Sequence, residues 1–433
     1  MPLLDRLRSI VGPAHVRAGV ELSPFVVEGC APEAAVFPGA VDEVAAVVRL
    51  AGETDVPVLP WGGGTATAVG TPTARPGVVL GLGRLNRLIE HEPGDLTATA
   101  EAGMTLGDLQ SALAARGQWL SLDPGDAERA TLGGVLAANA SGPRRHLYGT
   151  ARDLLIGLTV VAADGSIVHG GGKVVKNVAG YDLPKLFIGS WGTLGVIVEA
   201  TVKLRPRPAA ERLLAVRFDR LKDAGAAVRG LLASDLIPNA VEILDSPVCA
   251  GLGLVGSPTL VVGFDGLAEQ VDWQAAELSA LATPLGGHGA AELDPMVWSR
   301  LAVGARAAFP ALAAVMGFSV LPTVVAELME QGAAAARNRG LQSAWSAHAG
   351  IGSVTGALAA DPEPARVAAA LEEWRGHARA GGGHATLEWA PLAVKSRVPV
   401  WDDPGSATRL MRGIKEQLDP RNLLNPGRFV AGI

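Results

Sequence analysis

Residues 56–65 read VPVLPWGGGT, an apolar run that ends directly in three glycines. The run predicts a buried strand, and the glycines predict a turn at its carboxyl end. Consecutive glycines permit positive φ and leave bare backbone N–H groups, which form a concave nest suited to a pyrophosphate. An ordinary glycine turn is the alternative interpretation. The candidate phosphate-binding residues are Gly62, Gly63, Gly64, Thr65 and, just beyond the turn, Thr67.

A second segment rich in glycine and other small residues spans residues 123–142 and reads DPGDAERATLGGVLAANASG. It predicts a helix from Thr131 to Asn139, whose amino end would offer unpaired N–H donors and a positive dipole end to a second phosphate face. Tight helix packing alone would also explain these glycines. Two glycine turns this far apart suit a ligand as long as a dinucleotide. The candidate residues are Pro124, Gly125, Thr131, Gly134, Asn139, Ser141 and Gly142.

A third cluster comprises KNVAGYDL at 176–183 and GTLGVI at 192–197. The backbone at 195–198 is expected to hydrogen-bond an adenine edge. Its candidate ligand-binding residues are Lys176, Tyr181, Gly195 and Ile197.

The composition narrows the function classes. A length of 433 residues predicts two to four domains, and 48% hydrophobic residues occur without a run long enough to span a membrane. The net charge of −6 comes without a basic stripe, which argues against a nucleic-acid partner. Two cysteines, Cys30 and Cys249, predict no disulfide framework, and no secretory signal is recognisable at the amino end, so a cytoplasmic location is expected.

Other catalytic motifs are missing or misplaced. Residues 251–256, GLGLVG, satisfy GxGxxG, but the strand-like TLVVGF follows, so they are interpreted as a loop. The sequence contains no GxxxxGKS/T and no HExxH, and no GxSxG with a plausible triad. Kinase, zinc-protease and hydrolase functions therefore have no support.

Beyond Pro206 and Pro208 the pattern changes to alternating strands and helices. Two ferredoxin-like halves packed into one sheet would account for it. The expected strands are 212–219, 259–265, 314–321, 342–348, 352–358 and 385–390, and the expected helices are 222–234, 267–283, 323–337 and 363–378. A further helix is expected near 182–190, and Asp164-Gly165 predicts a hairpin.

Four segments carry a resemblance to a known family: PWGGGT, TLGGVLAANASGPRRHLYGTARDLLIGLTVVAADG, KNVAGYDLPKLFIGSWGTLGVI and the terminal NLLNPGRF. Together they resemble the vanillyl-alcohol oxidase, or PCMH-type, flavoprotein superfamily of FAD-linked oxidases, and within it the FAD-binding subunits of bacterial glycolate oxidases. The resemblance implies an α+β chain in three parts. These are a two-lobed FAD-binding domain (1–207), a ferredoxin-like cap or substrate domain (208–403), and a helix and turn that return to the FAD domain (404–433).

The resemblance also implies cofactor contacts. Residues 62–65 would bind the pyrophosphate of FAD, the candidates between Pro124 and Gly142 would line the flavin, and Ile197 would lie on the adenine side. Lys176 or Tyr181 would approach the flavin, and Asn425 of the terminal motif would complete the site. Relatives that bind FAD covalently use a His in the glycine loop or a Cys in the second segment. Neither is present here, so non-covalent FAD is expected.

The metal motifs of catalytic relatives are degraded. Relatives that oxidise D-lactate or 2-hydroxyglutarate carry HxGDGN and SGEHGIG, whose His and Glu bind a divalent metal. Here the first reads HAGIGS from His348 and the second reads GHATLE, with His384 and Glu388. No metal site is therefore expected. His348, His384 and Lys395 remain candidates for a catalytic base, each with a structural role as the alternative.

The leading functional hypothesis is an FAD-binding subunit of a glycolate (2-hydroxy acid) oxidase complex. As the resemblance implies, it would pass electrons to a partner, beside a catalytic flavin subunit and an iron–sulfur subunit. It would be cytoplasmic or held at the inner face of the membrane through those partners. One alternative is a self-sufficient FAD-dependent D-2-hydroxy-acid dehydrogenase, and another is a non-catalytic FAD-bearing assembly subunit.

Overall fold

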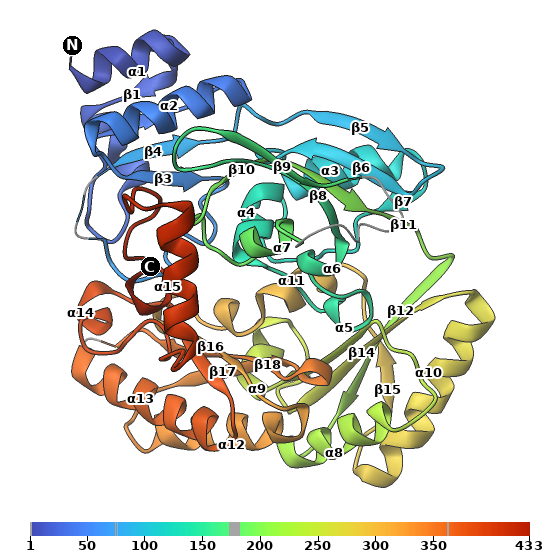
Figure 1. Cartoon of the computed structure of the whole chain (residues 1–433). Coiled ribbons are helices and arrows are strands. Elements are labelled where there is room, and N and C mark those ends of the chain that lie inside the picture. The colour runs from blue at the N-terminus through green and yellow to red at the C-terminus, as the bar shows by residue number, and fades with distance from the viewer. Residues whose placement is uncertain (1, 74, 76, 173–181, 362) are drawn as a thin grey trace.

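The first lobe of the chain is a small parallel sheet covered by helices (Figure 1). The computed structural model describes residues 2–73, 75, 77–172, 182–361 and 363–433. The lobe has strand order β1-β2-β4-β3, parallel except for β1. Its elements are α1 (Leu3–Val11), β1 (Val16–Arg17), β2 (Ala34–Val36), α2 (Val41–Thr54), β3 (Val58–Trp61) and β4 (Val78–Gly81). The predicted strand before the glycines is β3, displaced by two residues toward them.

The second lobe is an antiparallel sheet of order β5-β6-β10-β8-β9. Its strands are β5 (Leu88–Glu92), β6 (Thr97–Glu101), β8 (Leu155–Val161), β9 (Ile167–Gly171) and β10 (Val196–Lys203). Its helices are α3 (Leu106–Ala114), α4 (Leu132–Ala138), α5 (Arg145–Tyr148), α6 (Ala151–Leu154) and α7 (Pro184–Phe187). A short pair, β7 (Gln118–Trp119) and β11 (Arg205–Pro206), lies beside it. One hydrophobic core joins the two lobes.

The predictions for this lobe are confirmed with one correction. The helix expected over 131–139 is α4, and Asp164-Gly165 joins β8 to β9 in a hairpin. The helix expected near 182–190 is wrong in length, because α7 covers only Pro184–Phe187. Gly189 and Trp191 adopt φ of +72° and +56°, which a right-handed helix cannot accommodate.

The third part is one antiparallel sheet of eight strands, in the order β15-β12-β14-β13-β17-β18-β16-β19. Each half is a strand-helix-strand-strand-helix-strand unit, so the predicted ferredoxin-like pattern is confirmed, and the halves meet where β13 pairs with β17. The strands are β12 (Ala210–Arg217), β13 (Ala240–Leu244), β14 (Thr259–Gly266), β15 (Ala290–Glu292), β16 (Leu312–Ser319), β17 (Ser343–His348), β18 (Ser353–Ala359) and β19 (His384–Trp389). The sequence expectation missed β13 and β15.

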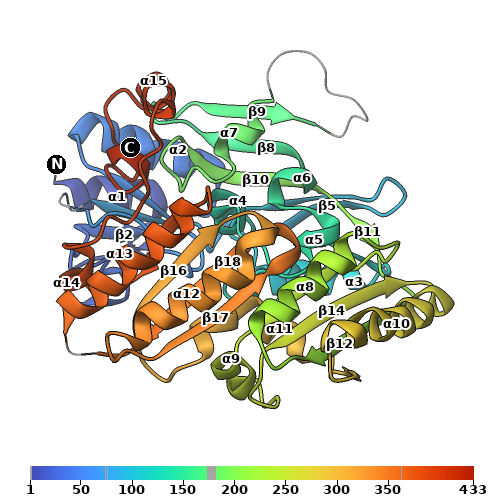
Figure 2. The same cartoon turned by 90° about the horizontal axis from the view of Figure 1, so that it is seen from below.

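The two faces of this sheet are covered differently. The long helices α8 (Leu221–Leu232), α10 (Ala268–Ala282), α12 (Val325–Arg337) and α13 (Pro364–Ala380) pack on one face, as the view from below shows (Figure 2). The opposite face carries α9 (Ser246–Gly251) and α11 (Val297–Val303), which pack on a separate core. The decoy motif at 251–256 begins at the last residue of α9 and continues as a loop, so it opens no helix.

The C-terminal tail returns to the first lobe. After α14 (Leu392–Lys395), the amphipathic helix α15 (Ala407–Leu418) leads into a turn that runs beside β3 (Figure 1). The Val58 N–H donates to Leu423 O (2.8 Å) and the Asn425 N–H donates to Val58 O (2.9 Å). The tail therefore extends the parallel sheet next to the glycine loop. Among the described residues, no helix has the length and apolar character needed to cross a membrane.

Candidate functional site

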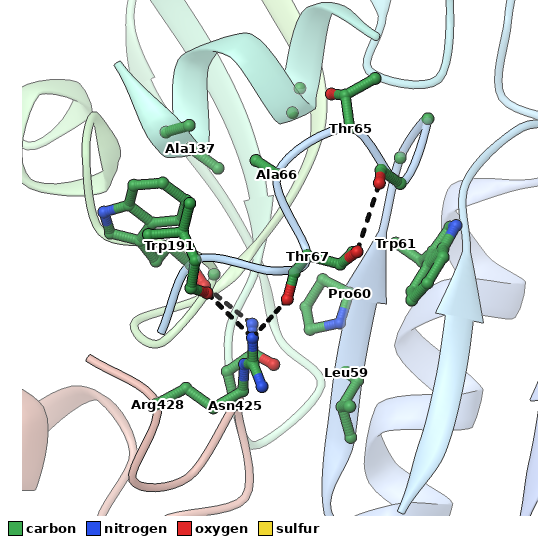
Figure 3. Close-up of a pocket in the computed structure, with 18 of the residues that line it drawn as sticks. Leu59, Pro60, Trp61, Thr65, Ala66, Thr67, Ala137, Trp191, Asn425 and Arg428 are labelled. Carbon is green, nitrogen blue, oxygen red and sulfur yellow. Dashed lines mark hydrogen bonds between the residues drawn. The ribbon is translucent and has the colours of Figure 1, made fainter. Parts of the chain in front are cut away.

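An open cavity with about 980 Å³ of empty space, part of it open to solvent, lies where the two lobes and the tail meet. Its walls come from residues 59–69, 133–138 and 191–197, and from Trp401, Asn425 and Arg428. Figure 3 shows the glycine loop and α4 on one side and the tail on the other. Segments far apart in sequence therefore form one pocket.

The glycine loop packs against the second glycine segment. A side chain at Gly63 would overlap the carbonyl oxygen of Arg129, and one at Gly62 would overlap the Thr131 hydroxyl. Gly64 adopts φ of +71°, and the Thr67 hydroxyl donates to its carbonyl oxygen (3.2 Å). The loop therefore needs glycine for close approach to a neighbouring segment as well as for its turn.

Helix α4 presents small side chains to the cavity. Thr131 is its N-cap and accepts the Gly134 N–H (3.3 Å), and Ala137 and Ala138 line the wall. Gly133 lies against Ala102 with no room for a side chain, so tight packing accounts for this glycine, while the Gly/Ala face of the helix borders the pocket. Asn139 ends α4 with φ of +50°. Its buried Oδ1 has no hydrogen-bond partner among the described residues.

The tail closes the opposite wall. Asn425 Nδ2 donates to Trp191 O (2.7 Å), and Arg428 Nη2 donates to the carbonyls of Thr67 (2.6 Å) and Val69 (2.9 Å) (Figure 3). The Trp401 indole N–H donates to Arg428 O (3.0 Å). These contacts fix the tail across the cavity.

Behind this wall is a buried ion pair. Lys395 Nζ bonds to Glu28 and donates to the carbonyls of Ala68 (2.6 Å) and Gly70 (3.3 Å). Burial lowers the pKa of Lys395, although Glu28 partly offsets this. Lys395, a predicted base candidate, therefore holds the loop at 67–70 through hydrogen bonds and does not line the cavity.

A second polar cluster lies between the two lobes and the eight-stranded sheet. His348 on β17 pairs with Glu242 on β13, with Nδ1 2.8 Å from both carboxylate oxygens, and Glu242 is 1% exposed. Burial raises the pKa of Glu242 and lowers that of His348, but the charge and hydrogen bond of Glu242, together with the charge of Asp123, raise the pKa of His348 overall. Asp123 acts electrostatically on His348, and burial raises the pKa of Asp123 to about 6.

Arg144 connects this cluster to both domains. Its guanidinium forms a bidentate pair with Glu211 on β12, in which Nε donates to Oε1 (3.2 Å) and Nη2 donates to Oε2 (2.9 Å), and it stacks on Trp298, with Cζ 3.9 Å from the ring centroid. Its backbone N–H donates to Asp123 Oδ2 (3.1 Å). Nearby, His146 has a buried Nδ1 without a partner among the described residues, and burial lowers its pKa.

The structure brings many of the predicted cofactor residues to the cavity wall and leaves others outside. Those in the wall are Gly62, Gly63, Gly64, Thr65, Thr67, Gly134, Gly195, Ile197 and Asn425. Thr131 lies directly behind the glycine loop. Those outside the wall are Pro124, Gly125, Asn139, Ser141 and Gly142, of which Gly125 faces Ala302 and Val303 near α11. Lys176 and Tyr181 lie outside the described residues.

The three base candidates are not brought together. His348 on β17 and His384 on β19 are separated by β18 and β16, and His384 is exposed. Glu388 pairs with Arg306. Within the described ranges, no three His, Cys, Asp or Glu residues are grouped as metal ligands.

The residues of the cavity fit FAD. The glycine loop offers backbone to a pyrophosphate, the Gly/Ala face of α4 leaves room for a flat ring, and the described wall residues include neither histidine nor cysteine. Sequence reasoning missed Trp61, Trp191, Trp401 and Arg428. Of these, Trp61, Trp191 and Arg428 stand in the motifs PWGGGT, SWGTLGVI and NPGR, next to predicted residues, whereas Trp401 had no such signal.

Comparisons with known proteins agree with this geometry. A family model described as "FAD binding domain" matches residues 32–171, and one described as "FAD linked oxidases, C-terminal domain" matches residues 207–429. Glycolate oxidase subunit GlcD of Bacillus subtilis is 31% identical over 92% of this chain and 89% of its own length. A probable mitochondrial D-lactate dehydrogenase of Danio rerio is 30% identical over 92% of this chain and 84% of its own length.

Solved structures share the fold. p-Cresol methylhydroxylase with bound substrate superposes with a TM-score of 0.81 at 20% identity, covering 98% of this chain and 96% of that one. Alkyldihydroxyacetonephosphate synthase superposes with a TM-score of 0.76 at 18% identity, covering 99% and 86%. They confirm the expected α+β, PCMH-type architecture. The chain belongs to the FAD-linked oxidase family and is an FAD-dependent oxidoreductase.

Proposed function

We propose that this chain holds FAD non-covalently in the cavity and serves the oxidation of a small 2-hydroxy acid, with glycolate as the leading candidate. The observation that carries the proposal is the glycine-walled cavity in a chain whose relatives are named for glycolate and D-lactate oxidation. Bound FAD would supply the hydride and electron chemistry. The protein would position the cofactor and exclude water from the cavity.

The wall residues have separable tasks. Residues 62–65 offer backbone N–H groups to the pyrophosphate, and α4 supplies a flat small-residue surface. The side chain of Trp191 contacts Trp401, with ring centroids 5.8 Å apart, so that two apolar rings from different segments shield one end of the cavity. Asn425 orients this shield by donating to Trp191 O.

We further propose that the chain works as an FAD-binding subunit beside a catalytic flavin subunit and an iron–sulfur subunit. Cys30 and Cys249 are both free, and two cysteines cannot provide the four ligands of an iron–sulfur cluster, so electrons need another route out. On this proposal the chain is cytoplasmic, or held at the inner face of the membrane through its partners.

The test is anaerobic reduction of the purified chain. Glycolate and D-lactate are added separately to the full-length protein, and the visible flavin absorbance is followed with and without the partner subunits. The subunit proposal predicts an intact flavin spectrum for the chain alone. Bleaching by the chain alone would overturn it, while bleaching in neither setting would identify a non-catalytic, FAD-bearing assembly subunit.

One observation favours the second candidate, a self-sufficient D-2-hydroxy-acid dehydrogenase. His348 is held by a buried carboxylate, an arrangement that suits a proton acceptor. If the chain alone is reduced by substrate, His348→Gln should slow that reduction by about 100-fold or more. His384→Gln, in an exposed residue, is the matched control and should leave the rate unchanged.

A further inference from the structure

Arg428 is a buried cation in the cavity wall with an unused hydrogen-bonding nitrogen. Its residue is 7% exposed, and Nη2 is saturated by the carbonyls of Thr67 and Val69. Nη1 is also buried but has no hydrogen-bond partner among the described residues. A buried charged donor without a partner is costly, because the group loses its hydration and gains no hydrogen bond in return, so it indicates a missing acceptor.

The charges around Arg428 do not balance. Glu28 is the carboxylate that acts on Arg428, and the same carboxylate is bonded to Lys395. Lys395 and Arg428 disfavour each other, and burial lowers the pKa of both. The cluster therefore has two cations for one carboxylate, and the excess positive charge lies at the cavity.

Arg428 is also the only charged residue among the described residues that line the cavity. The glycine loop can offer N–H groups but no full charge. Of the parts of FAD, only the pyrophosphate is anionic. The Arg428 guanidinium bonds to the backbone at Thr67 and Val69, directly after the predicted pyrophosphate loop.

We propose that Arg428 is the charge partner of the FAD pyrophosphate, so that docking of the C-terminal tail and retention of FAD are coupled. Arg428 belongs to the tail, whereas the loop belongs to the first lobe, and each would hold the other in place through the cofactor. The inference rests on the FAD site of the proposed function, and it is independent of which acid is oxidised.

The experiment compares FAD with riboflavin, which shares the flavin ring and ribityl chain but lacks the pyrophosphate and the adenosine joined to it. FAD is released from the full-length protein, and the dissociation constants of FAD and riboflavin for the same chain are measured by flavin fluorescence. Arg428→Gln should weaken FAD binding by about 10- to 100-fold, the range expected for a lost charged hydrogen bond. Riboflavin, which lacks the pyrophosphate, should lose less than about threefold.

Arg421→Gln is the matched control. Arg421 lies on the same tail, half-exposed and 3.7 Å from Asp55, and should leave both constants within about threefold of the wild type. If Arg428→Gln fails to fold, Arg428→Lys decides the question, because it keeps the charge. Arg428→Lys should weaken FAD binding less than Arg428→Gln does. It should still weaken FAD binding more than riboflavin binding.

Equal losses for FAD and riboflavin, in either variant, would overturn the proposal and assign Arg428 a purely structural role. A lower melting temperature with an unchanged ratio would likewise overturn it, because Arg428 would then stabilise the fold without a specific role at the pyrophosphate. Reduction of the isolated chain's flavin by glycolate would count against the proposed subunit function alone. A wild-type chain that binds neither ligand would contradict the FAD site itself.

Discussion

The cavity wall and the interdomain cluster are built by opposite means. The wall at 62–67 and 133–138 is made of backbone, glycine and alanine, with one charged residue, Arg428. The cluster of Asp123, Glu242 and His348, with Arg144 beside it, is made of buried titratable groups that interact electrostatically and by hydrogen bonds between the second lobe and the eight-stranded sheet. The first region depends on the absence of side chains and the second on their pairing. The wall should therefore be sensitive to added side chains, and the cluster to the removal of a charged partner.

The largest effect is expected at Gly63. In Gly63→Ala the new methyl group would overlap the carbonyl of Arg129, a backbone atom that cannot move aside. We expect a loss of about 3 kcal/mol or more of unfolding free energy and loss of bound FAD. Thermal unfolding and the flavin content of the purified protein measure both.

Gly83→Ala is the matched control for this substitution, because no atom lies within 4 Å of a methyl group at Gly83. It should behave as the wild type. A Gly63→Ala variant with full flavin content would show that the loop can separate from residue 129, which contradicts close packing as the reason for the glycine.

The next effect tests the cluster. Glu242→Ala leaves His348 and the adjoining buried charges without their main carboxylate, and should cost about 3 kcal/mol in urea unfolding. Glu292→Ala removes a carboxylate from an exposed pair with Arg212 and should cost less than about 1 kcal/mol. Similar losses of unfolding free energy in the two variants would contradict a larger stabilising effect of the buried pair than of the exposed one.

The cavity wall could be predicted from the sequence and the interdomain cluster could not, because only the wall is built from local motifs. Residues 62–65 and Thr131 stand in contiguous motifs, and local glycine chemistry identifies them. The interdomain cluster has no local signal, because the sheet order brings Glu242 and His348 together, and Asp123 reaches them from a loop of the second lobe. Strand β13, which carries Glu242, was itself missed, so no spacing argument could have paired it with His348.

The role of the C-terminal tail could be predicted from the sequence only in part. Asn425 was predicted because it belongs to the terminal NPGR motif. The role of Arg428 in the same motif became visible only when its partners, Thr67 and Val69, were found in the first lobe. Trp191 and Trp401 gave no sign of their contact, since 210 positions separate them (401 − 191).

A smaller, pH-dependent effect is expected at Asp123. Its folded-state pKa of about 6 lies above the usual carboxylate value because of burial. The folded state therefore binds the proton more tightly, so this stabilising contribution is complete below about pH 4 and is lost as the pH rises through about 6. Asp123→Asn should gain up to about 2 kcal/mol relative to the wild type on going from about pH 4.5 to about pH 7.5.

Urea unfolding of both proteins at these two pH values measures the difference. A difference between the wild type and Asp123→Asn that stays constant with pH would show that Asp123 is charged throughout, held so by Arg144.

The smallest effect distinguishes capping from cofactor support. Thr131→Ala and Thr105→Ala each remove an N-cap, of α4 and α3 respectively, and each should cost about 1 kcal/mol. Only Thr131 lies behind the glycine loop, so only its variant should also weaken FAD binding. Equal FAD affinity in the two variants would show that the N-cap of α4 does not help the glycine loop to bind FAD.

The most direct test of FAD binding in the cavity is the state of the flavin in the purified full-length chain. The protein is denatured, precipitated and centrifuged, and FAD is quantified in the supernatant and the pellet. We predict about one FAD per chain, all of it in the supernatant, because the described cavity wall contains no histidine or cysteine to hold it covalently. Flavin retained in the pellet would contradict non-covalent binding, and a chain that never binds FAD would contradict the site itself.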